Sequence, residues 1–139
     1  MKKTNTIKHY KTLTKACSAV GFDVILPPRF KLIEINVIDN KILELRYSSV
    51  IVRKAKYDKN NVIGEGISGV YPGAYSNNCN RVEFEDSEIK GVGYWNGSSK
   101  NPKEYLAIWD DNAKKYSYSV YSPKGIKLKS MSTWQKKFK

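Results

Sequence analysis

The sequence predicts an α+β fold, a curved antiparallel meander sheet of about 6–8 strands with an N-terminal helix and a C-terminal amphipathic helix. Two observations support this prediction. Apolar and polar residues alternate over several short stretches, and this period of two is typical of half-buried strands. Ten tyrosines, three tryptophans and many β-branched residues also favour sheet over helix.

Three central strands are predicted within residues 30–57, and the rest of the chain is expected to cover them. These strands are Lys31–Ile38, Ile42–Tyr47 and Val50–Tyr57. Ile33 belongs to the apolar set of the first strand, whereas Glu44 and Arg46 are expected on the polar face of the second. Asp39-Asn40 provides the turn between them, because both side chains bond local backbone and Asn tolerates a positive φ.

The amino-terminal helix is predicted over Thr12–Val20, with Thr12 as its cap and Gly21 as its left-handed stop. A short strand, Phe22–Leu26, is expected to follow, and Pro27-Pro28 would end it at a sheet edge.

The carboxyl half predicts four more strands, over Arg81–Glu85, Ile89–Trp95, Tyr105–Trp109 and Tyr116–Tyr121. Val82 and Phe84 are expected to point inward. Aromatic cross-strand pairs are also expected, with Trp109 or Tyr105 opposite Tyr116 or Tyr118 of the next strand. The closing helix is predicted from apolar residues spaced three, three and four apart, which are Leu128, Met131, Trp134 and Phe138.

The chain is expected to form one domain over residues 10–139, behind a basic, flexible leader at residues 1–9. The formal charge of +12 is concentrated at the two ends. Five lysines precede the first acidic residue, Asp23, and the stretch from Lys114 onward holds eight lysines and no acid. Such ends attract an anionic partner, while flexible lysines that merely keep the chain in solution are the plainer explanation.

The sequence contains no apolar run long enough to cross a membrane, so we expect no transmembrane segment. The start has no apolar core typical of a signal peptide. An extracytoplasmic location would follow if a leader was trimmed, and a cytoplasmic one if the chain is complete as written. The sequence leaves both locations open.

We expect no enzymatic activity, no metal and no cofactor. His9 is the single histidine and falls in the basic leader, away from any nucleophile pattern. Cys17 is expected as a buried free thiol, with a disulfide to Cys79 as the alternative in an exported protein. The glycines of residues 64–69 match G-x-G-x-x-G, but Pro72 prevents the long helix that a dinucleotide site requires.

Aromatic residues near loops and lysines near the carboxyl end are the candidate partner-binding residues. Trp and Tyr are enriched at binding hot spots, and lysines attract anions. Trp95 has an equally weighted alternative, in which it folds over the sheet edge as local core. The candidates are Tyr71, Tyr75, Tyr94, Trp95, Lys124, Lys127, Lys136 and Lys137.

Several short motifs occur together in a shared order. They are the helix-then-extended opening Tyr10–Phe22 before Pro27-Pro28, Arg53-Lys54-Ala55, Ile67–Tyr71 with Tyr75, Lys90-Gly91, Tyr105–Trp109 and Tyr116–Val120. With these motifs, the chain resembles the small uncharacterised extracytoplasmic domains of Gram-positive gut bacteria, which are lipoprotein-like or anti-sigma-factor-associated. The resemblance implies an α+β domain with a curved antiparallel sheet, no established activity and no cofactor, and it transfers no functional residue. The strong positive charge and the insertion-like residues 60–66 depart from that pattern.

These observations favour a non-catalytic binding or sensing domain that recognises a protein or an anionic surface through loop aromatics and basic ends. An intracellular nucleic-acid-binding or inhibitor protein of mobile-element origin is the alternative. A hydrolase that uses a carboxylate pair, such as Asp110-Asp111, is a third hypothesis.

Overall fold

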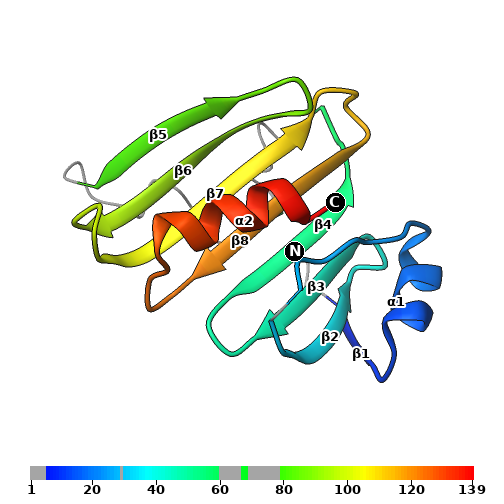
Figure 1. Ribbon diagram of the computed structural model, residues 1–139. Helices are drawn as coiled ribbons and strands as arrows, with labels where there is room; N and C mark the ends of the chain where they lie inside the picture. The colour runs from blue at the N-terminus through cyan, green and yellow to red at the C-terminus, as the bar shows by residue number, and fades with distance from the viewer. Residues whose placement is uncertain (1–5, 29, 60–66, 69–78) are drawn as a thin grey trace, which may run out of the picture.

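A computed structural model describes residues 6–28, 30–59, 67–68 and 79–139 of the chain (Figure 1). Within these residues, the chain forms one antiparallel sheet of eight strands and two helices, which confirms the predicted α+β class. In chain order, the elements are β1 (Ile7–Tyr10), α1 (Leu13–Val20), β2 (Leu32–Ile38), β3 (Ile42–Tyr47), β4 (Ile51–Lys56), β5 (Asn80–Glu85), β6 (Ile89–Gly97), β7 (Pro102–Asp111), β8 (Tyr116–Ser122) and α2 (Leu128–Lys137).

The sheet consists of two four-stranded meanders that join side by side. Its order is β1-β2-β3-β4-β8-β7-β6-β5, so the central contact is between β4 and β8, and β1 and β5 form the edges. Both helices pack on one face, which we call the helix face, with α1 beside β1–β3 and α2 crossing β7 and β8 (Figure 1). We call the other side the opposite face.

The predicted turn and helix ends are confirmed. Asp39 and Asn40 both have positive φ, at 54° and 58°, and together with Lys41 they connect Ile38 to its cross-strand partner Ile42. The hydroxyl of Thr12 accepts a hydrogen bond from the Lys15 amide at 3.3 Å, and Gly21 ends α1 with φ 82°. These local signals therefore set the turn between β2 and β3 and both ends of α1.

The core lies between the helices and the sheet. Trp109 is fully buried and stacks on Tyr118, its cross-strand partner, with ring centroids 5.6 Å apart. Phe138, beyond the end of α2, meets the Trp109 ring edge-on at 6.0 Å. Gly91 lies under Trp109, and a Cβ at this position would overlap the Trp109 Cβ. The closing-helix residues Met131 and Trp134 are also fully buried, as predicted.

Four local expectations are wrong. Residues 22–26 form no strand of the sheet, because Ile25 instead exchanges two backbone hydrogen bonds with Lys139, at 2.8 and 2.9 Å. Ile33 is 62% exposed because the register shifts between its neighbours on β2. Val82 is 41% exposed on the edge strand β5. Residues 7–9, assigned to a flexible leader, belong to β1, where backbone pairing with β2 holds even largely exposed residues.

Candidate functional site

A lysine-rich surface forms at one end of the sheet, where the loop from β6 to β7 meets the connection from β8 to α2. Gly125 brings them together, since its φ of 91° suits only glycine and a Cβ there would overlap the carbonyl of Pro102. The close backbone contact places Lys124 beside the start of β7, which carries Lys103. Two loops far apart in sequence therefore present their lysines on one surface.

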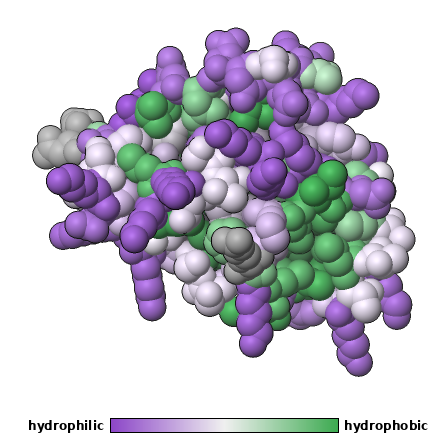
Figure 2. All heavy atoms as spheres, viewed as in Figure 1, coloured by the Kyte–Doolittle hydropathy of each residue, from purple (hydrophilic) through white to green (hydrophobic). Residues whose placement is uncertain are grey.

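We call this the lysine surface, because its members are all exposed and all carry the same sign of charge. Residues 97–103 and 122–129 contain no Asp or Glu. Among the described residues, no ion pair involves any lysine of this surface. Figure 2 shows hydrophilic side chains projecting at the left, where the two loops lie in Figure 1. The members of the lysine surface are Lys100, Lys103, Lys124, Lys127 and Lys129.

The acidic side chain next in sequence is directed elsewhere. Glu104 follows Lys103 on β7 and therefore belongs to the opposite face of the sheet. Its carboxylate accepts hydrogen bonds from the Asn96 amide at 3.1 Å and the Tyr121 hydroxyl at 2.6 Å. Burial, helped by the Glu104 carboxylate, raises the pKa of Tyr121 to about 12. Glu104 is thus occupied by its own partners and does not pair with the lysine surface.

The amino end of α2 adds to the positive potential. Lys127 is the N-cap, its side chain makes no capping hydrogen bond, and the first turn contains no acidic residue. The first amides of a helix carry a partial positive charge, which a carboxylate in the first turn ordinarily offsets. Here Lys129 occupies that turn instead, so the end of the helix repels cations and attracts anions.

The structure brings together only some of the predicted lysines. Lys124 and Lys127 belong to the lysine surface, while Lys136 and Lys137 are exposed at the other end of α2. At 1.5 Å per residue, about 14 Å of helix separates Lys127 from Lys136. The neighbouring Lys139 pairs with Glu88 at 2.7 Å. The lysines of the basic carboxyl end therefore fall into two separate groups, one on the lysine surface and one at the far end of α2.

The predicted aromatic residues do not gather at this surface. The prediction that Trp95 is exposed for partner binding is wrong. Its side chain is only 8% exposed and stacks on Tyr105 within the core, with ring centroids 5.3 Å apart, as the alternative interpretation of Trp95 as a core residue expected. Tyr94 is half-buried on β6, with the Arg81 guanidinium 5.9 Å from its ring centre. Tyr71 and Tyr75 lie outside the described residues.

Sequence reasoning missed three members of the lysine surface, which are Lys100, Lys103 and Lys129. The signal was present in the sequence, because residues 98–103 carry two lysines in a turn-rich, acid-free loop. This loop comes near Lys124 and Lys127 only because the strand order places the start of β7 beside the end of β8.

A buried polar network on the opposite face was also missed. Glu44 is 2% exposed and accepts hydrogen bonds from Arg53 at 2.6 and 2.9 Å, and from Arg46 at 3.0 Å. Asn36 donates to the same carboxylate at 3.1 Å, and its amide oxygen faces His9 at 2.5 Å. Burial alone would raise the pKa of Glu44, but these hydrogen bonds and the Arg53 charge hold it below its usual range.

The two cysteines are free and belong to opposite faces of the sheet. Cys17 lies on the buried side of α1, which packs on the helix face, and burial raises the pKa of its thiol. Cys79 packs against a small second cluster on the opposite face, with Leu106 and Ile108. The structure therefore has the free Cys17 thiol that was predicted rather than the alternative disulfide. Of the glycine motif, only Ile67 and Ser68 lie within the described residues.

Neither helix in the described part of the chain has the length and apolar character needed to cross a membrane. No protein-family model matches the chain, and the searches of curated proteins and of solved structures found no match either.

Proposed function

We propose that this protein is a non-catalytic binding domain that holds an anionic partner, either a surface or an acidic protein, on its lysine surface. The observation that carries the proposal is the convergence of five exposed lysines from two segments, the β6–β7 loop with the start of β7 and the β8–α2 connection with the first turn of α2. Neither residues 97–103 nor residues 122–129 contain an acid. Lysines kept only for solubility have no reason to converge, since like charges repel and a folded chain gains by separating them.

The type of residue also favours a surface or polymer over a base-specific nucleic-acid site. Lysine is a point charge that contacts phosphate or carboxylate without fixed geometry, whereas arginine forms bidentate contacts. Each lysine near an anionic surface contributes about 1 kcal/mol, so five give about 5 kcal/mol. This corresponds to a dissociation constant on the order of 0.2 mM, which is a weak and salt-sensitive interaction.

Binding to a panel of anions tests the proposal. In a sedimentation assay, the protein should co-sediment with vesicles of mixed phosphatidylglycerol and phosphatidylcholine. It should stay in the supernatant with vesicles of pure phosphatidylcholine. Soluble linear polyphosphate should compete, and roughly threefold more salt should release the protein because exposed charges are screened. Equal binding to neutral vesicles, or no binding to any anion, would contradict the proposal.

The same panel separates the nucleic-acid alternative. A short DNA duplex and polyphosphate of equal total charge should compete with similar strength if only charge density is recognised. A duplex that competes at least about tenfold better would favour the nucleic-acid-binding protein and overturn recognition of a surface.

A further inference from the structure

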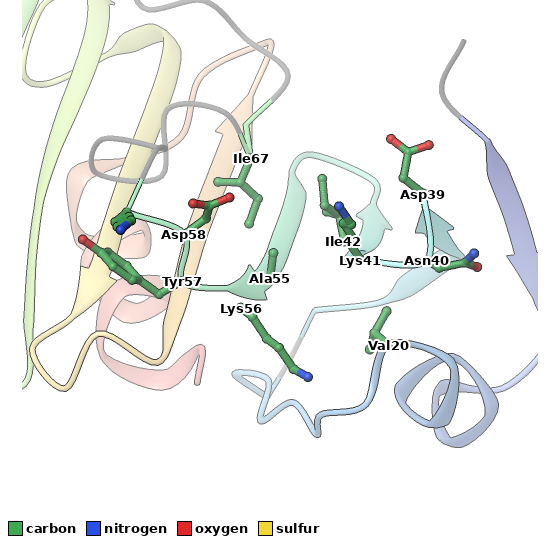
Figure 3. Close-up of a pocket in the computed structure, with 11 residues that line it drawn as sticks. Val20, Asp39, Asn40, Lys41, Ile42, Ala55, Lys56, Tyr57, Asp58 and Ile67 are labelled. Carbon is green, nitrogen blue, oxygen red and sulfur yellow. The ribbon is translucent and has the colours of Figure 1, made fainter. Parts of the chain in front are cut away.

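A pocket of about 760 Å³ lies at the other end of the sheet from the lysine surface. It is lined by residues at the start of β3 and the end of β4, and it lies between the last turn of α1 and Ile67 (Figure 3). The end of β4 pairs with the start of β8, so the end of β8, beside the lysine surface, lies at the far end of the strands. The pocket and the lysine surface are therefore separate. Its lining residues include four apolar side chains, three lysines and two aspartates.

The apolar part of the pocket is built on paired strands. Ile42 and Ala55 are direct cross-strand partners, and the Ile67 side chain points toward Ala55 (Figure 3). Val20 contributes from the end of α1. The volume lies within the roughly 300–1,000 Å³ of small-molecule sites, which are mostly apolar with a few placed polar groups.

The Ile67 wall is held by the buried polar network. The Arg53 guanidinium donates a hydrogen bond to the Ile67 carbonyl at 2.9 Å, and Glu44 fixes the same guanidinium at 2.6 Å. Ile67 itself is only 3% exposed. A wall supported through a buried ion pair is formed before any ligand arrives, which lowers the entropic cost of binding.

The charged groups of the pocket favour an anion. Lys41, Lys56 and Lys59 are exposed at its margin, and none of them forms an ion pair with another described residue. Asp39 accepts a hydrogen bond from the Thr6 amide at 2.8 Å, and Figure 3 shows its carboxylate directed away from Ala55. Asp58 is the second carboxylate, so cations outnumber anions by three to two.

We propose that this pocket binds a small amphipathic anion, with a carboxylate at the lysines and an aliphatic chain or aromatic ring against Ile42, Ala55 and Ile67. This site goes beyond the lysine surface, because it is concave, partly apolar and sized for one small molecule. An extended anionic surface does not enter such a pocket, and a small carboxylate gains little from exposed lysines alone.

Titrations with decanoate and decyltrimethylammonium test the proposal, because the two probes share an aliphatic chain and differ in charge. Calorimetry below the micellar concentration should show one saturable site for decanoate and at least about tenfold weaker binding of the cation. Ala55→Trp fills the apolar part and should weaken decanoate at least about tenfold. Lys41→Ala with Lys59→Ala should weaken it about threefold to tenfold, since two charges are lost at an exposed margin.

Matched controls keep the test decisive. Lys124→Ala with Lys127→Ala removes the same charge from the lysine surface and should leave decanoate affinity unchanged. Ala55→Val gives a smaller filling of the pocket should Ala55→Trp fail to fold, and near-ultraviolet circular dichroism checks each variant. Equal binding of both probes, or unchanged affinity in the folded pocket variants, would overturn the proposal. Vesicle binding through the lysine surface is read separately, so failure of one proposal is distinguishable from failure of the other.

Discussion

Glu44→Gln is the most informative stability test of the buried polar network. The substitution preserves shape but removes the charge from a carboxylate that is 2% exposed and accepts bonds from Arg53 and Arg46. The new amide group would also face the Arg53 donors. Breaking a buried ion pair costs about 3–5 kcal/mol. Because the Arg53 and Arg46 side chains are 19% and 45% exposed, water relieves part of this cost, and we expect about 3 kcal/mol.

Urea unfolding at neutral pH measures this cost, with Glu83→Gln as the matched control. Glu83 pairs with Arg81 at 2.9 Å, but its side chain is 73% exposed, so its loss should cost less than about 0.5 kcal/mol. The Glu44 pKa is lowered in the folded protein, so its stabilisation is present above the ordinary value of 4.5 and is lost as pH falls through the folded pKa. The difference between wild type and Glu44→Gln should therefore shrink in acid. Equal stability of the two Gln variants would refute the reasoning.

Three further predictions concern the core, the surface and alkaline pH. Trp109→Ala should cost about 3–5 kcal/mol in the same assay, because it empties a fully buried site, and an unchanged unfolding midpoint would contradict the core assignment. Lys136→Ala with Lys137→Ala should change stability by less than about 0.5 kcal/mol, since both side chains are exposed, and a larger loss in urea unfolding would reveal a structural role. Burial raises the pKa of Tyr47 and Tyr105 to about 12, above the ordinary 10, so their stabilisation is complete below pH 10 and is lost as pH rises toward 12. Absorbance at a tyrosinate wavelength should show these rings ionising together with unfolding, and free ionisation near pH 10 in the folded protein would argue against their burial.

The fold was predictable where local and long-range signals agree. The Asp39-Asn40 turn is set by two residues that tolerate positive φ, and the alternation on either side fixes which face is buried. The spacing of Met131, Trp134 and Phe138 gave the closing helix for the same reason. At these positions, local geometry and burial require the same structure.

The predictions from sequence failed where tertiary packing decides the environment of a side chain. Glu44 alternates with apolar residues just as a solvent-facing glutamate would, and only its cross-strand partners Asn36 and Arg53 make its burial tolerable. Trp95 adjoins a turn-rich loop in sequence, yet it pairs directly with Tyr105 and packs in the core. Two of the five members of the lysine surface, Lys124 and Lys127, were predicted from the sequence, whereas the neighbouring loop joins them only through the strand order.

A pair of charge-reversal variants tests the location of the proposed binding surface most directly. Reversing Lys103, Lys124 and Lys127 to Glu lowers the formal charge from +12 to +6, and reversing the exposed Lys15, Lys136 and Lys137 lowers it by the same amount. Loss of three lysines at an anionic surface costs about 3 kcal/mol, so the first variant should bind phosphatidylglycerol vesicles at least about 100-fold more weakly. The second should stay within about fivefold of wild type, because charges beyond about 8 Å are screened at physiological salt. An equal loss in both variants would show that only net charge matters and would contradict a built surface.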